Sequence, residues 1–350
     1  MKLMKKLIAA LTLTGLLAAS LGLSAFADDA ATLLARHQVT KHFVMAESLD
    51  VPDAEFSFEA TAVTTDAPTV IIGSIAYSSA DDKGTLSTEG IYTLDKDAEI
   101  TFGTFPHAGT YEYTVTEIAG SADGITYDNT SYTMKVYVAN NGIGTLDVQS
   151  ITVEADNGKQ ESLSFTNTYC KNGSLTITKN TEGDLADKTK DFAFTITFIK
   201  SGTESDSVTS YTGKIGEEPI ECTIGQETSF YLHDGESLVF DDLPVGTRYV
   251  VTEVAAADGY TPSVSVIENG VQTVTNNTTA EANALSTANA GFSNLVGEKE
   301  NSVVFTNTCG DAPATGLVLK NLPFLLLIVL PALALILPVA AKSRMKKRNH

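Results

Sequence analysis

Two stretches of identical sequence, Phe165–Thr168 and Phe305–Thr308, constrain the fold of this chain more than any other feature. Each lies in a run whose alternate residues are apolar, and the next residue on that face is an asparagine, Asn167 or Asn307. Side chains two positions apart on a β-strand share a face, so both asparagines should point into a core. A buried amide without a partner is costly. The pattern therefore predicts a polar partner inside each half of the chain.

A lysine and a glutamate in each half also lie on apolar strand faces. Corresponding residues are separated by nearly the same number of positions: 179 − 41 = 138 for the lysines, 253 − 117 = 136 for the glutamates and 307 − 167 = 140 for the asparagines. Such constant spacing indicates an internal repeat of large period. The six candidate residues are Lys41, Glu117 and Asn167 in the first half, and Lys179, Glu253 and Asn307 in the second.

The composition is typical of an all-β protein. Valine, isoleucine, threonine, tyrosine and phenylalanine are abundant, tryptophan is absent, and glycines separate the alternating runs. β-Branched and aromatic residues favour strands, and a chain of 350 residues is long enough for two domains with ordinary cores. We therefore expect two tandem all-β domains, at residues 28–170 and 171–310.

The first 27 residues have the three parts of a secretory signal peptide. Lys2, Lys5 and Lys6 precede an apolar run, and Ala25–Ala27 has the small-x-small pattern of a cleavage site. A retained membrane anchor is the alternative, but the cleavage pattern and the polar residues that follow favour removal. We expect the mature chain to begin near Asp28.

The C-terminal segment, residues 311–350, also has three parts. A short motif precedes a mostly apolar run from Leu317 to Ala341, and a basic tail follows the run. About 20 apolar residues can span a bilayer, and a basic tail stays cytoplasmic, so a plain membrane anchor is one interpretation. The motif resembles the cell-wall sorting signal of Gram-positive bacteria, with alanine in place of the usual leucine. By that resemblance, a sortase would cut after the threonine of Ala312, Pro313, Ala314, Thr315 and Gly316.

The charge of the predicted mature chain is strongly negative. Of the 23 basic residues, three precede residue 28 and six follow Gly316, so 14 remain against 43 acidic residues, and 14 − 43 = −29. Such a surface repels nucleic acid and anionic membranes, and it suits a secreted protein held at the cell surface. The odd number of cysteines, Cys170, Cys222 and Cys309, supports no disulfide assignment; buried or inert thiols are favoured.

Each set of lysine, glutamate and asparagine has two chemical interpretations. One is a buried ion pair beside an amide, in which desolvation can exceed the Coulomb attraction. The other is a reaction. Burial lowers the pKa of a lysine and raises that of a carboxyl group, so a neutral amine can attack the asparagine carbonyl while a protonated glutamate polarises it and transfers protons. Ammonia leaves and a Lys–Asn isopeptide bond forms, without cofactor or metal.

The motifs in both halves resemble known surface-protein domains. Gly109–Glu117, Gly124–Asp128 and Phe165–Tyr169 resemble the streptococcal pilin isopeptide-linkage domain, and Leu243–Gly246 and Tyr249–Glu253 resemble CnaB-like domains. The resemblance implies Ig-like β-sandwiches. It also implies two intramolecular isopeptide bonds, Lys41–Asn167 promoted by Glu117 and Lys179–Asn307 promoted by Glu253.

A structural pilus subunit is the leading functional prediction. A sortase would join Thr315 to a lysine of the next pilin subunit or to cell-wall peptide, and Lys159, which lies in a predicted turn, fits best as the acceptor. The alternative is a monomeric wall-anchored adhesin or accessory pilin that binds a host ligand. An enzyme acting on external substrates is disfavoured, because no catalytic constellation or metal-ligand spacing stands out among the five histidines and three cysteines.

Overall fold

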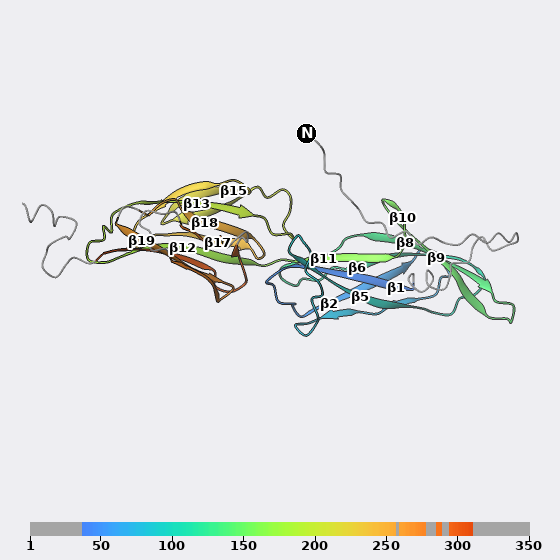
Figure 1. Cartoon of the computed structure of the whole chain (residues 1–350). Helices are drawn as coiled ribbons and strands as arrows, with labels where there is room; N and C mark the ends of the chain where they lie inside the picture. Colours follow the sequence, from blue (N-terminus) through green and yellow to red (C-terminus); the bar gives the residue numbers. More distant parts are fainter. Residues whose placement is uncertain (1–36, 257–258, 278–284, 289–293, 311–350) are drawn as a thin grey trace, which may run out of the picture.

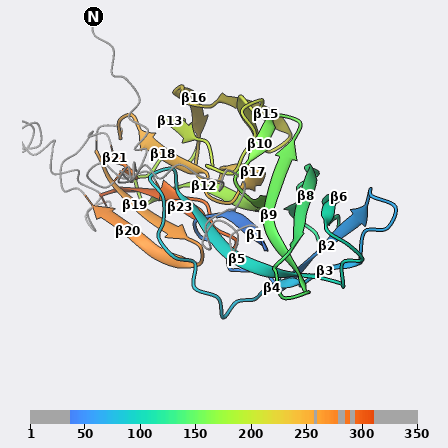
Figure 2. The ribbon, with the colours of Figure 1, turned by 90° about the vertical axis from the view of Figure 1, so that its right-hand side faces the viewer.

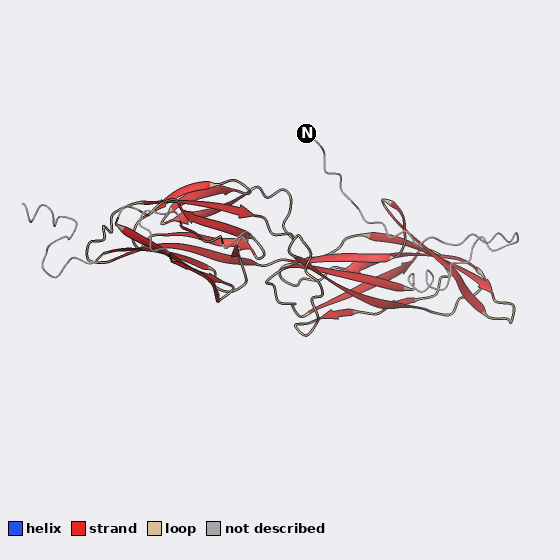
Figure 3. Ribbon diagram, in the orientation of Figure 1, coloured by secondary structure: helices blue, strands red, loops and turns tan. Residues whose placement is uncertain are grey.

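The computed structural model describes residues 37–256, 259–277, 285–288 and 294–310. Every element in these ranges is a β-strand (Figure 3), which confirms the all-β prediction. The predicted signal peptide and the predicted sorting signal lie outside the described residues. Among the residues that are described, no helix has the length and apolar character needed to cross a membrane.

The first domain consists of two sheets that face each other across one core (Figure 1). Figure 2 shows β9, β8, β6 and β2 side by side in the larger of them. One sheet has the order β3 (Val70–Ile72), β5 (Ile91–Phe102), β1 (Gln38–Ala46), β11 (Leu163–Tyr169) and β7 (Ile125–Thr126). The other has the order β10 (Gly158–Gln160), β9 (Leu146–Ala155), β8 (Ser131–Asn140), β6 (Gly109–Ile118), β2 (Ala54–Ala62) and β4 (Ile75–Tyr77).

The second domain repeats this two-sheet plan with different strand numbers. One sheet has the order β15 (Glu218–Thr223), β14 (Ser210–Ile215), β17 (Ser237–Pro244), β12 (Asn172–Glu182), β23 (Ser302–Cys309), β19 (Tyr260–Glu268) and β20 (Val271–Asn277). The other has the order β16 (Thr228–Leu232), β13 (Phe192–Ile199), β18 (Arg248–Glu253) and β21 (Leu285–Ser286), and β22 (Asn294–Leu295) also pairs with β18.

Strict alternation along the strands produces the two cores. On β1, for example, every second residue from Val39 to Phe43 is fully buried, and β13 buries alternate residues from Phe192 to Phe198. Burying apolar area contributes roughly 25 cal/mol per Å², so shifting either strand by one residue would expose its whole apolar face. The register of the polar residues on these faces is therefore fixed by the apolar residues around them.

In each domain the first and last strands are parallel neighbours in one sheet. Lys41 of β1 pairs with Phe165 of β11, and Phe43 pairs with Asn167. The second domain has the same offset, because Lys179 of β12 pairs with Phe305 of β23 and Thr181 pairs with Asn307. The lysine and the asparagine therefore lie on adjacent strands, two residues apart in register, in both domains.

The two domains lie end to end (Figure 1), and only Cys170 and Lys171 separate β11 from β12. Val245 follows β17 of the second domain, but its side chain packs into the core of the first domain. Gly246 has a positive φ of 93°, and a Cβ atom there would come within 2.7 Å of the Ala46 side chain. Arg248 and Glu47 form an ion pair across the same junction. The junction is thus a packed contact in addition to a short linker.

Candidate functional site: two buried Lys-Glu-Asn clusters

The first cluster brings together residues from three strands. Lys41 and Asn167 project from β1 and β11, and Glu117 reaches them from β6 in the facing sheet. Glu117 joins the two: Lys41 Nζ lies 2.5 Å from Oε2, and Asn167 Nδ2 donates to Oε1 over 2.5 Å. The side chains of Lys41 and Glu117 are fully buried, as is Asn167. The lysine amine and the asparagine amide therefore share one buried carboxyl group.

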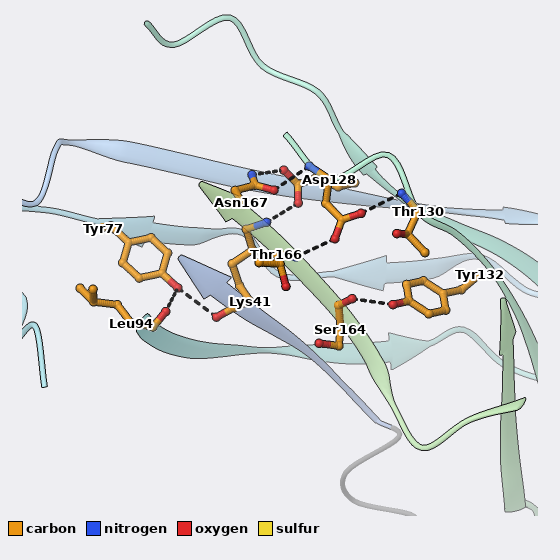
Figure 4. A network of polar contacts seen from close by, with 10 residues as sticks. Lys41, Tyr77, Leu94, Asp128, Thr130, Tyr132, Ser164, Thr166 and Asn167 are labelled. Carbon is orange, nitrogen blue, oxygen red and sulfur yellow. Dashed lines mark hydrogen bonds and ion pairs between the residues drawn. The ribbon is translucent and has the colours of Figure 1, made fainter. Parts of the chain in front are cut away.

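The carbonyl oxygen of Asn167 has a different partner from the one expected from the sequence. The main-chain N–H of Asp128 donates to Asn167 Oδ1 over 2.7 Å (Figure 4). We expected Glu117 to polarise this carbonyl group, but the Glu117 carboxyl group faces the amide nitrogen instead. The reason is that the segment after β7 brings a main-chain donor to the oxygen, leaving the nitrogen to face the carboxyl group.

Burial changes the acid–base properties of the first cluster. Burial lowers the pKa of Lys41, and the hydrogen bond and negative charge of Glu117 oppose this only in part. Burial raises the pKa of Asp128, but hydrogen bonds from Thr130 and Thr166 outweigh it and hold that pKa below its ordinary value. The lysine thus loses its proton more readily than an exposed lysine, and only a neutral amine can act as a nucleophile.

The second cluster has the same three residue types in the same places. Lys179 of β12, Glu253 of β18 and Asn307 of β23 are all fully buried. Asn307 Nδ2 donates to Glu253 Oε1 over 2.7 Å, and Lys179 Nζ lies 3.2 Å from the same oxygen. Burial lowers the pKa of Lys179 to about 8 against the opposing charge of Glu253.

The second cluster is less completely hydrogen-bonded than the first. Lys179 Nζ, Glu253 Oε2 and Asn307 Oδ1 have no hydrogen-bond partner among the described residues. The 3.2 Å contact between Lys179 and Glu253 is therefore an ion pair whose geometry does not satisfy a hydrogen bond. Unsatisfied buried polar atoms are costly, and here they belong to the lysine and asparagine that an isopeptide reaction would join and to the glutamate that would promote it.

The other candidate residues that the structure describes are not part of either cluster. Lys159 is exposed and belongs to the short strand β10, directly after the turn, rather than to the turn itself. Cys170, Cys222 and Cys309 are free thiols, and Cys222 is buried. The motif Ala312–Gly316 lies outside the described residues. Within the described ranges, no group of histidine, cysteine, aspartate and glutamate residues is arranged to hold a metal ion.

Asp128 is the functional candidate that the sequence analysis did not identify. Its contribution to the cluster is a main-chain N–H, and every residue except proline has that group. The segment Gly124–Asp128 was noted only as part of a resemblance. Nothing in the alternation of side chains could have shown which main-chain donor faces Asn167.

Each domain thus holds a buried lysine on its first strand, a buried asparagine on its last strand and a buried glutamate on the facing sheet. Family models match both domains. Residues 37–170 match the Spy0128-like isopeptide containing domain, and residues 173–308 match a domain of unknown function, DUF7601. The chain is thus a homologue of streptococcal pilins, with an isopeptide-type first domain followed by a second domain.

Individual relatives show how far the similarity extends. A pilin of Streptococcus pyogenes serotype M1 is 29% identical over 337 residues, which cover 90% of this chain and 91% of that protein. The pilus tip adhesin Cpa of Streptococcus pyogenes is 43% identical over 84 residues, 24% of this chain and 12% of the adhesin. The crystal structure of the major pilin from Streptococcus pyogenes is 26% identical, with a TM-score of 0.37, over 79% of this chain and 99% of that one. By their names, these relatives are pilins and a pilus tip adhesin.

Proposed function

We propose that this chain is the backbone subunit of a covalent pilus and that an intramolecular isopeptide bond closes each of its domains. The bonds join Lys41 to Asn167 and Lys179 to Asn307, with Glu117 and Glu253 as the promoting acids. The observation that carries the proposal is that lysine, glutamate and asparagine meet in both cores with the same strand register. The fold that suits this role is an Ig-like sandwich in the first domain and a CnaB-like sandwich in the second.

The reaction needs only the three side chains. The neutral amine of Lys41 attacks the Asn167 side-chain carbonyl carbon, and Glu117 takes the proton that the amine releases and delivers it to the departing amide nitrogen. One C–N bond forms, another breaks, and ammonia leaves. The core holds amine and amide together, and such proximity supplies much of the rate. The contact of one Glu117 carboxyl group with both nitrogens supports this path.

The bonds would change how the subunit carries force. Tension between Lys159, where a neighbouring subunit would be attached, and Thr315 would follow β11 into β12 and pass from Lys179 to Asn307, so the second sandwich between those two residues would carry none of it. In the first domain, the Lys41–Asn167 bond would tie β1 to the loaded strand β11. The closed loop spans 167 − 41 = 126 positions. By analogy with disulfides, this closure stabilises the domain by on the order of 4–5 kcal/mol. Unlike a disulfide, the bond resists reduction.

Assembly would use the two ends of the subunit. A sortase would cut after Thr315 and join it to Lys159 of the next subunit or, at the base, to cell-wall peptide. Lys159 suits this role because it is exposed on β10, which projects from the first domain (Figure 1). The mature protein would then lie outside the cell, in a pilus attached to the wall.

An accessory pilin or wall-anchored adhesin that binds a host ligand is the second candidate. The 43% identity to part of a pilus tip adhesin favours it. The two candidates differ in a simple observation: a backbone subunit gives a ladder of covalent multimers when wall extracts are run in SDS, and Lys159→Arg abolishes the ladder. An accessory pilin is incorporated without forming multimers of itself.

The intact mass of a recombinant chain of residues 28–315 tests the cross-links. We expect a mass lower than that of the sequence by two ammonia molecules. Peptide mapping should find the two branched peptides that contain Lys41 with Asn167 and Lys179 with Asn307. A full mass would overturn the proposal of spontaneous bonds.

A further inference from the structure

We propose that the main-chain N–H of Asp128 stabilises the oxyanion that forms on Asn167 during closure of the first domain, and that the Asp128 carboxylate positions this N–H. The inference rests on the proposed isopeptide reaction and adds a catalytic group to it. It also predicts that the isopeptide bond of the second domain forms without a main-chain N–H donor to the asparagine oxygen. The N–H is catalytic because it contacts a reacting atom, whereas the carboxylate acts through it.

The orientation of the Asn167 amide supports this assignment. Its oxygen accepts from Asp128 N over 2.7 Å, and its nitrogen donates to Glu117 over 2.5 Å. The reverse orientation would place two N–H donors against each other and a carbonyl oxygen against a carboxyl oxygen. The surroundings therefore fix which end of the amide leaves and which end becomes the oxyanion.

The Asp128 carboxylate fixes the position of its own N–H. β7 ends at Thr126, which pairs with Thr168 of β11, and beyond it Asp128 N turns to the Asn167 side chain. The carboxylate then accepts from the main-chain N–H of Thr166 over 2.6 Å and from that of Thr130 over 2.8 Å (Figure 4). Asp128 is thereby held against the residue that directly precedes Asn167.

The chemical step follows from this geometry. As the Lys41 amine bonds to the Asn167 side-chain carbonyl carbon, the electron pair of the carbonyl π bond moves to Oδ1, which already faces the Asp128 N–H. Glu117 moves one proton from the amine to Nδ2. The electron pair on Oδ1 then re-forms the carbonyl as the bond from the carbon to Nδ2 breaks, and ammonia leaves with the pair of that bond. A donor already in place where negative charge develops lowers the barrier without reorganising the site.

Among the described residues, the second domain offers no equivalent donor. β19 pairs continuously with β23, and Pro262, which has no N–H, lies opposite Asn307. Ser263 occupies the position that corresponds to Asp128. Ser263 pairs with Thr306, the residue before Asn307, and Asp128 binds Thr166, the residue before Asn167. The Ser263 side chain donates to the Thr306 main-chain oxygen over 3.2 Å. Asn307 Oδ1 has no hydrogen-bond partner within the described ranges.

The test measures the rate at which each bond forms. Chains of residues 28–315 are made by cell-free translation, collected in urea and refolded by dilution, and ammonia loss is followed by intact mass with peptide mapping. Malic acid in place of Asp128 changes only its N–H to an ester oxygen. We expect this to slow the first-domain reaction by about 10²- to 10³-fold and to leave the second-domain rate unchanged. The matched control is glyceric acid in place of Ser263, which should change neither rate.

The outcomes separate this inference from the proposed function. If the unmodified chain keeps both ammonia molecules, the isopeptide proposal fails. If the unmodified chain reacts and the ester at residue 128 reacts at the same rate, only the role of the Asp128 N–H is overturned. Hydrogen exchange of the unmodified, cross-linked chain gives a second test that no variant can confound. The Asp128 N–H should be protected as strongly as the β11 amides, and exchange at the rate of an exposed loop would overturn the inference.

Discussion

The two buried clusters are alike in their reactants and different in what surrounds them. Both place lysine and asparagine on parallel first and last strands with the same two-residue offset, and both supply a glutamate from the facing sheet. Within the part of the chain that the structure describes, only the first supplies an N–H to the asparagine carbonyl. The repeated sandwich thus brings the three side chains together in both domains. In the proposed reaction, stabilising the transition state would depend on one local segment beside the last strand of the first domain.

Removal of either glutamate should have the largest effect and should show whether the domains react independently. Glu117→Ala removes the shared carboxyl group of the first cluster, so the first bond should not form. The mass of this variant should exceed that calculated for the same variant with both bonds by one ammonia molecule. Glu253→Ala should do the same for the second bond alone. The matched control is Glu154→Ala, at a largely exposed side chain that pairs with Lys135, and it should keep both bonds. Loss of both bonds from a single glutamate change would show that the domains are coupled.

Removal of either asparagine should separate the contribution of the isopeptide bond to the stability of its domain from that of the ion pair. Asn167→Ala and Asn307→Ala prevent the bonds but keep each lysine beside its glutamate. The loops are of similar size, 126 positions and 307 − 179 = 128 positions. We expect each domain to lose on the order of 4–5 kcal/mol of stability against unfolding, measured by calorimetry or urea unfolding. A loss in one domain many times that in the other would contradict a common closure effect.

The two isopeptide bonds of the unmodified chain should form at different rates. The first domain has the Asp128 donor and the second has none among the described residues, so the first bond should form on the order of 10² times faster. Refolding from urea, with aliquots quenched in acid and mapped by mass spectrometry, measures both rates in one sample. Equal rates would show that the donor difference has no kinetic consequence.

The pH dependence of the rate of bond formation should show that the lysine reacts as a neutral amine. Burial lowers the pKa of Lys179 to about 8, and only the neutral amine attacks. The second bond should therefore form faster as pH rises, about tenfold per pH unit well below 8, and level off above about 8. Burial also lowers the pKa of Lys41, so the first bond should respond in the same direction. A rate that falls as pH rises through 8 would contradict attack by the neutral amine.

Much of the fold and of the clusters could be predicted from sequence, because side-chain alternation reports directly on strand faces. Lys41, Glu117 and Asn167 each interrupt an apolar face, and each is buried in the structure. Main-chain groups leave no such trace, so the Asp128 donor was missed. The packing of Val245 into the neighbouring domain could not be predicted from the sequence either. The sequence pattern of an apolar turn residue does not show which of two cores it packs into.

The parallel pairing of first and last strands has a consequence for how such chains can diverge. Once both bonds form, the shortest covalent route through the described chain runs from Lys41 to Asn167, along the linker to Lys179, and then to Asn307. Hairpins such as β8–β9 and β14–β15 lie off this route. Their lengths and surfaces can change, by substitution or insertion, without altering the length of this covalent route through the two domains.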